Sequence, residues 1–101
     1  MITRLKKEDL KEAMEGNHEL YNELSLVADK LRTIYVALGW THMTAEFSEA
    51  DDTVEYLTKG VLESIYNGQE RSSHATAGLC VEAYWEEGLD TLSLDYSFKL
   101  I

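Results

Sequence analysis

Apolar residues recur at alternating steps of three and four positions between Leu10 and Leu38. Eight of the nine positions in this series are apolar, Asn17 being the exception, and the spacing predicts a helix that ends at Gly39. A second apolar column runs beside the first and consists of Met14, Tyr21, Ala28 and Tyr35. The resulting stripe is wider than the seam of a two-stranded coiled coil, and it is typical of a helix that packs on a sheet or in a bundle.

Gly16 and Asn17 interrupt the pattern early in this segment. Either the helix is continuous and Asn17 is a polar residue that sets its register, or a first helix ends at Gly16 and Asn17 caps a second one. The break is favoured, because glycine inside a helix costs about 1 kcal/mol relative to alanine and asparagine is a strong N-cap.

A further helix is predicted over about residues 49–66. Ser48 is a suitable N-cap with Asp51 three residues later, and Asn67-Gly68 ends the segment. The apolar face of this helix consists of Ala50, Val54, Leu57, Val61 and Ile65. The composition of residues 68–75, GQERSSHA, predicts a loop.

The period of the pattern changes to two in the last quarter of the chain. Apolar and other residues alternate over residues 79–86 and again over 91–100, on both sides of the turn sequence EGLD at 87–90. In the first run the apolar set is Leu79, Val81, Ala83 and Trp85, and in the second it is Leu92, Leu94, Tyr96, Phe98 and Leu100. Such alternation around a short turn predicts an antiparallel β-hairpin with one buried face.

A two-stranded hairpin is only marginally stable by itself. It needs the helices, a third strand from residues 41–47, or a second copy of the chain; residues 41–47 form either that extended segment or an early helical turn. We therefore expect a single α+β domain over residues 1–101, with the N-terminal helices packed on the C-terminal hairpin. Homodimerisation through an exposed strand edge or through the apolar helix stripe is a further expectation.

The composition fits one cytoplasmic domain. A chain of 101 residues with 45% hydrophobic content is long enough for one core. No apolar run approaches the roughly 18 residues of a membrane span, and no apolar stretch of a secretory signal follows the first basic residues. Cys80 is the single cysteine, which excludes an intramolecular disulfide and favours a reducing compartment, the cytosol of a host cell if the protein is viral.

Negative charge is concentrated in the second part of the chain. The net charge is -10; residues 1–40 hold seven acids and six bases, whereas residues 41–101 hold twelve acids and three bases. Such a surface repels nucleic acid and anionic lipid, and it accelerates encounter with a basic partner. Direct binding to nucleic acid or to a membrane is therefore not expected.

Two acidic segments account for much of this excess. Five of the ten residues 46–55, EFSEADDTVE, are acids, and five more lie within residues 82–95, with no base in either segment. Acids in the first turn of a helix gain about 0.3 to 1 kcal/mol each from the helix dipole, which accounts for Glu49, Asp51 and Asp52. The other acids are either a solvated surface that keeps a small protein soluble or a docking surface.

The spacing of the acidic residues gives little indication of a catalytic site or a metal site. The adjacent Asp51 and Asp52 do not have the alternating spacing of a calcium loop. The pairs Glu46-x-x-Glu49 and Glu87-x-x-Asp90 resemble the ExxE and ExxD magnesium sites of the MazG-type nucleotide pyrophosphohydrolases, and this resemblance implies magnesium-dependent hydrolysis of a nucleotide as an alternative function. It covers these four residues, and Gly88 places the second pair in a turn. We expect no catalytic residue, metal or cofactor.

The acidic side chains are expected to point away from the apolar faces of the predicted helix and hairpin. Asp51, Asp52 and Glu55 fall on the side of their helix away from its apolar face, and Glu82, Glu86 and Asp95 point away from the apolar face of the hairpin, so two acidic ridges are expected to share one exterior. Tyrosines beside them are suitable interface anchors. The predicted partner-binding residues are Glu46, Glu49, Asp51, Asp52, Glu55, Glu82, Glu86, Glu87, Asp90, Asp95, Tyr56 and Tyr84.

The sequence thus predicts a non-enzymatic interaction protein that binds a basic surface of a protein, such as a nucleic-acid-binding protein or complex. In its short, acidic and motif-poor character it is similar to phage proteins that inhibit restriction or CRISPR systems or take over host functions, some of which mimic nucleic acid. A homo-oligomeric scaffold is the first alternative to this function, and the pyrophosphohydrolase is the second.

Overall fold

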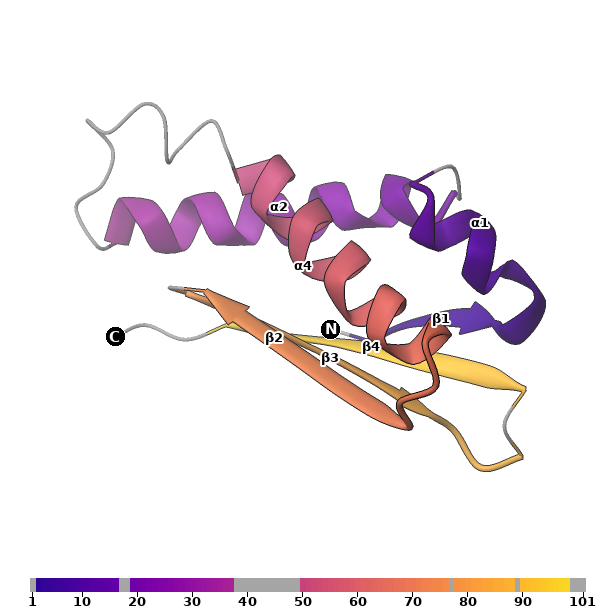
Figure 1. The fold of residues 1–101 in the computed structure, drawn as a ribbon. Coiled ribbons are helices and arrows are strands. Elements are labelled where there is room, and N and C mark those ends of the chain that lie inside the picture. The colour runs from indigo at the N-terminus through magenta and orange to yellow at the C-terminus, as the bar shows by residue number, and fades with distance from the viewer. Residues whose placement is uncertain (1, 17–18, 38–49, 77, 89, 99–101) are drawn as a thin grey trace.

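The computed structural model describes residues 2–16, 19–37, 50–76, 78–88 and 90–98. Its elements in chain order are β1 (Ile2–Lys6), the 3-10 helix η1 (Lys7–Asp9), α1 (Leu10–Met14), α2 (Leu20–Ala37), α4 (Ala50–Tyr66), β2 (Arg71–Thr76), β3 (Leu79–Trp85) and β4 (Thr91–Phe98). The helices lie together on one side of the strands (Figure 1). This arrangement confirms the predicted α+β class, with N-terminal helices packed on a C-terminal antiparallel hairpin.

The strands form one antiparallel sheet in the order β1-β4-β3-β2. The predicted hairpin, β3 and β4, occupies its centre, with Ala83 opposite Leu94 and Val81 opposite Tyr96. On the outer sides, Leu5 of β1 pairs with Leu92 and His74 of β2 pairs with Val81. The two outer strands and the helix layer together supply the support that an isolated hairpin lacks.

The core lies between the sheet and the helices. The hairpin contributes the buried side chains Leu79, Val81, Ala83, Leu92, Leu94 and Tyr96. From the helices come Leu24, Val27, Leu31, Val54, Leu57, Val61, Leu62 and Ile65 among others. The broad stripe of α2 is confirmed, since Ala28 and Tyr35 are buried beside Leu24 and Val27. Full burial of one such aliphatic side chain contributes about 1.5 to 3 kcal/mol relative to exposure, so this core is the main source of stability.

The predicted break near Gly16 is present. Gly16 has a φ of 87°, a left-handed backbone conformation that favours glycine. The Tyr21 hydroxyl donates a hydrogen bond of 2.6 Å to the carbonyl oxygen of Ala13, which ties α2 to α1 across the break. The proposed cap Asn17, the cap Ser48 and the helix end at Gly39 lie outside the described residues.

The helix predicted over about residues 49–66 is α4, and it ends as expected. The N–H of Gly68, which has a φ of 107°, donates to the carbonyl of Ile65, and the N–H of Gln69 donates to Ser64. These bonds satisfy the last carbonyls of α4 and turn the chain into β2.

The sequence analysis did not predict two of the strands, β1 and β2. The prediction of a loop over residues 68–75 is wrong for residues 71–75, which belong to β2 (Arg71–Thr76), and no strand was predicted for Ile2–Lys6. An outer strand that covers only part of the core needs few apolar residues: β1 buries only Thr3 and Leu5, and β2 buries none fully. Period-two alternation of apolar residues is therefore absent from both. The alternative third strand from residues 41–47 lies outside the described residues.

Candidate functional site

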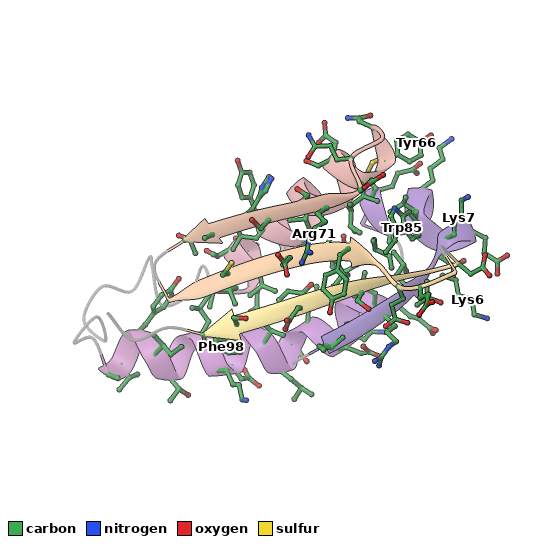
Figure 2. All side chains as sticks on the ribbon, turned by 90° about the horizontal axis from the view of Figure 1, so that it is seen from below. Lys6, Lys7, Tyr66, Arg71, Trp85 and Phe98 are labelled. Carbon is green, nitrogen blue, oxygen red and sulfur yellow. The ribbon has the colours of Figure 1, made fainter. Side chains whose placement is uncertain are left out.

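The sheet presents one polar face on the side opposite the helices. Because side chains alternate along a strand, every second residue points away from the core. This open face carries Ile2, Arg4 and Lys6 of β1, Arg71, Ser73 and Ala75 of β2, Cys80, Glu82 and Tyr84 of β3, and Thr91, Ser93, Asp95 and Ser97 of β4. Figure 2 views the molecule from this side. Among the described residues, no helix covers this face.

Acids occupy the two central strands of the open face, and bases occupy the outer strands. Glu82 of β3 and Asp95 of β4 are directly opposite each other in the register. Like charges at directly opposed positions destabilise a sheet. Glu82 forms an ion pair of 3.1 Å with Arg71, whereas Asp95 forms no ion pair within the described residues. The centre of the face therefore keeps an excess of negative charge.

Arg71 also orders the aromatic side chain of the open face. Its guanidinium lies 5.3 Å from the ring centroid of Tyr84, a cation–π distance, while it pairs with Glu82. Tyr84 is half-buried, with Arg71 opposite it on β2 and Ser93 opposite it on β4. These contacts hold Tyr84 and Glu82 in place, so that a partner would meet them already positioned.

Glu86 is held at the end of β3 by two hydrogen bonds. Its Oε1 accepts from the Ser93 hydroxyl at 2.6 Å and from Nε of Arg4 at 2.9 Å. The Ser93 bond, followed by the Arg4 contact, lowers the pKa of Glu86 below its ordinary value. Glu86 is therefore ionised at neutral pH, and its charge is compensated by Arg4.

The hairpin tip adds two exposed acids, Glu87 and Asp90. The tip is anchored by backbone hydrogen bonds from Glu86 to Thr91 at 2.8 Å and from Lys7 to Asp90 at 3.0 Å. Gly88 has a φ of 99°, as expected in a turn. Glu87 and Asp90 thus lie in the connection between β3 and β4, and not on a helix like the magnesium sites that the pair resembles.

The described residues contain no group of three or more His, Cys, Asp and Glu side chains placed to hold a metal ion. The other half of the resemblance, Glu46 and Glu49, lies outside the described residues. In that described part of the chain, no helix is long and apolar enough to cross a membrane.

The acids of α4 belong to the opposite layer of the molecule. Asp51 pairs with Arg32 of α2, which also bonds Asp29 at 2.8 Å, and Glu55 pairs with Lys59 at 2.8 Å. Because α4 lies on the helix side of the sheet, these acids cannot share an exterior with Glu82 and Asp95. The expectation of two ridges on one exterior is therefore wrong.

The predicted partner-binding residues consequently fall into separate groups. The hairpin group comprises Glu82, Tyr84, Glu86, Glu87, Asp90 and Asp95, and the helix group comprises Asp51, Asp52, Glu55 and Tyr56. The sequence missed the basic flanks of the hairpin group, Arg4 and Arg71, because neither outer strand was predicted. The positions of Arg4 and Arg71 in the sequence do not indicate that these residues lie beside Glu86 and Glu82.

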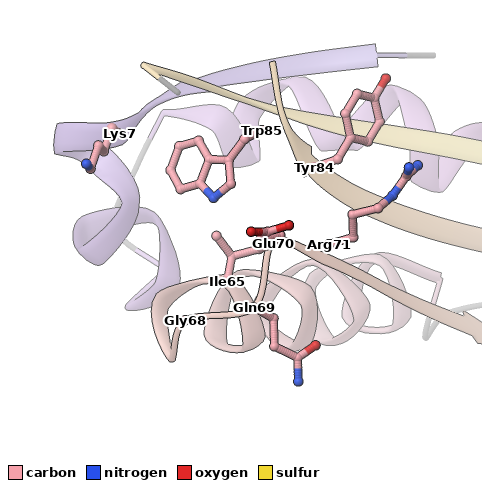
Figure 3. A pocket seen from close by; sticks show the side chains of 8 residues that line it. All are labelled: Lys7, Ile65, Gly68, Gln69, Glu70, Arg71, Tyr84 and Trp85. Atoms are coloured by element: carbon pink, nitrogen blue, oxygen red, sulfur yellow. The ribbon is translucent and has the colours of Figure 1, made fainter. Parts of the chain in front are cut away.

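A hollow of about 490 Å³ opens at the end of the sheet, between α4 and the hairpin. Figure 3 shows the Trp85 indole in this hollow, with Lys7 on one side and Ile65 and Glu70 on the other. Its polar lining side chains Lys7, Gln69, Glu70 and Arg71 are all exposed. With no buried polar side chain to fix an orientation, this hollow lacks the convergent polar groups of a small-molecule site.

The open face of the sheet is thus the region where charge, an aromatic side chain and fixed geometry coincide. The chain matches no family model, and neither a curated protein nor a solved structure is significantly similar to it.

Proposed function

We propose that this protein is a non-enzymatic binding protein that docks the open face of its hairpin on a basic surface of another protein. The observation that carries the proposal is the direct opposition of Glu82 and Asp95 at the centre of a sheet face that no described helix covers. Two carboxylates so placed repel each other in the free protein. A cationic group of a partner between them would relieve the repulsion that the pair of Glu82 with Arg71 leaves.

Arginine is the partner side chain that suits this position best. A planar guanidinium can donate to both carboxylates at once and can also stack on the ring of Tyr84, as Arg71 does within the chain. The basic residues on the outer strands, Arg4 and Arg71, limit the negative stripe to the width of the hairpin. They would repel a partner whose charges are out of register, which favours specificity.

The net charge acts earlier, during approach. A charge of -10 on 101 residues attracts a basic partner over several ångströms and raises the association rate at low ionic strength. The same charge disfavours nucleic acid as the direct ligand. Inhibition of a nucleic-acid-binding protein by occupying its basic cleft is the sharper form of the proposal, and it predicts that nucleic acid and this protein compete for that partner.

The test uses two double variants that remove the same charge from opposite layers. Glu82→Gln with Asp95→Asn alters the open face, and Asp51→Asn with Asp52→Asn alters α4. Each protein is immobilised, exposed to extract of its host cell, and washed at low and at moderate salt. We expect the wild-type protein and the α4 variant to retain the same basic protein and release it at moderate salt, and the open-face variant to lose it.

Two results would refute the proposal. One is retention of the same partner by the open-face variant with the affinity of the wild-type protein. The other is binding that does not weaken as salt is raised, because screening must reduce an interaction between exposed charges.

A further inference from the structure

The hollow at the end of the sheet lies where α4 stops and β2 starts. α4 ends at Tyr66, and β2 begins at Arg71, which lies opposite Tyr84. Trp85 therefore has Leu92 of β4 beside it on one side and no residue of β2 on the other. Its indole packs against the core and is nevertheless only half-buried, because neither α4 nor β2 extends over it (Figure 3).

The lining of the hollow combines an apolar part with balanced charge. The Trp85 indole and the buried Ile65 form the apolar part, and Lys7 and Glu70 are an exposed cation and an exposed anion of the lining. Arg71, the other cation, already forms its ion pair on the open face. A charged ligand would therefore meet no net attraction, whereas an uncharged apolar side chain would bury its surface against the indole and Ile65.

The hollow is continuous with the open face of the sheet. Arg71 and Tyr84 line it and also belong to the open face, where the guanidinium lies 5.3 Å from the ring centroid. On β3, Trp85 follows Glu82 by three residues, which corresponds to about 10 Å along a strand. A partner segment with a cation at Glu82 and Asp95 therefore reaches the hollow within a few residues. The contacts on the open face would fix the orientation of its side chain, so the hollow needs no buried polar group for that purpose.

Exposed charges alone give a weak interface. Exposed ion pairs contribute little and are screened by salt, and most of the affinity of a protein interface comes from a few side chains that fill a desolvated pocket. Aromatic side chains are frequent among these anchors, and a pair of aromatic rings gains more than its buried area alone predicts. The Trp85 indole offers such a ring at the border of the open face.

Charge selects a basic protein as the source of the anchor. A second copy of this chain is a poor occupant, because two copies with a net charge of -10 repel each other and acids would approach the acids of the hairpin. On the basis of the proposed function, we propose that the basic partner inserts an aromatic side chain into the hollow beside Trp85 while its cation engages Glu82 and Asp95. The binding surface then consists of the open face for charge and the hollow for the aromatic anchor.

The test is an NMR titration with acetylated and amidated peptides that contain two adjacent arginines. In one set a phenylalanine precedes or follows the arginines by two to four residues, and in the matched set alanine replaces it. These spacings bracket about 10 Å in an extended chain. At least one phenylalanine peptide should bind about tenfold tighter than its alanine counterpart and shift the indole N–H signal of Trp85.

Two variants assign the gain in affinity to the hollow. Trp85→Leu keeps an apolar side chain over the core, and it should remove most of the gain because the indole that the phenylalanine contacts is lost. Tyr66→Leu replaces an exposed aromatic residue outside the lining of the hollow and should leave the gain unchanged. Circular dichroism verifies that both variants fold, and the titration of the wild-type protein decides alone if Trp85→Leu does not.

The alanine peptides test the proposed function separately. Their binding should shift the signals of Glu82 and Asp95 and should be lost in the variant with Glu82→Gln and Asp95→Asn. If they bind in this way and phenylalanine adds no affinity, or adds affinity without a shift at Trp85, the role of the hollow is overturned and the proposed function stands. If no peptide binds the open face, the proposed function fails and the role of the hollow fails with it.

Discussion

The two faces of the sheet differ in what fixes their side chains. On the helix side, Val81, Ala83, Leu92 and Leu94 are fully buried and held by packing. On the open side, Arg4, Arg71, Glu82 and Glu86 are partly exposed and held by ion pairs and hydrogen bonds. Exposed ion pairs contribute at most about 1 kcal/mol each, much less than a buried aliphatic side chain. The covered face thus supplies stability, and the open face can carry charge arrangements chosen for binding.

Ser93 is an exception to this difference between the two faces. Ser93 belongs to the open side of β4 and is nevertheless only 1% exposed, with its hydroxyl bonded to Glu86. Its burial shows that the side chains from neighbouring strands cover part of the open face and make it a structured surface.

The largest contrast between the faces is expected from truncating one aliphatic side chain on each. Leu94→Ala removes a fully buried side chain and should lower the free energy of unfolding by about 2 to 5 kcal/mol. Ile2→Ala, on the open side next to the Leu94 pairing position, should cost less than about 1 kcal/mol, because Ile2 is 47% exposed. Urea denaturation measures both values, and equal losses would contradict the division into a covered and an open face.

A smaller effect is expected for a buried hydrogen bond between the helix layer and the sheet. The hydroxyls of Thr58 in α4 and Tyr96 in β4 are 2.7 Å apart, and both residues are almost completely buried. Burial raises the pKa of Tyr96 well above its ordinary value, so the hydroxyl stays protonated at neutral pH and any loss of stability by its ionisation begins only above about pH 10.

Removing either hydroxyl breaks this buried hydrogen bond. Tyr96→Phe and Thr58→Val should each lower the free energy of unfolding by about 1 to 3 kcal/mol. The double variant should lose less than the sum of the two, and a double-mutant cycle by urea denaturation measures the coupling. Additive losses would mean that the two hydroxyls do not act as a pair.

The smallest effect concerns Glu86 on the open face. Its lowered pKa contributes stability above the ordinary pKa of glutamate, and this contribution is lost as the pH falls through the lowered value. Ser93→Ala and Arg4→Ala should each raise the pKa of Glu86 towards its ordinary value. NMR titration of the side-chain carboxyl carbon measures the shift, and an unchanged pKa in Ser93→Ala would disprove this role of Ser93.

The covered face could be read from the sequence, because burial imposes a period on the chain. The positions of Leu24, Val27 and Leu31 on α2 and of Val81 and Leu94 on the hairpin follow directly from it. The break at Gly16 was also predictable, since glycine and asparagine have distinct local costs in a helix.

The outer strands and the grouping of the acids could not be read in the same way. β2 has no apolar period, and Arg4 reaches Glu86 only because β1 and β4 pair across most of the chain. Whether Asp51 and Glu82 share a surface depends on how the helix and sheet layers are arranged, which local patterns do not encode. The sequence therefore indicated the acids of the hairpin and their direction. It did not indicate their basic neighbours on the outer strands or their separation from the acids of α4.

The most direct test of the central proposal, that the open face of the hairpin is the binding surface, is an NMR titration of amide shifts with an arginine-rich peptide. We expect salt-sensitive shifts centred on Glu82, Tyr84 and Asp95, and none at Asp51 and Asp52. Shifts centred on the first turn of α4, or spread evenly over the acids of both layers, would contradict the proposal.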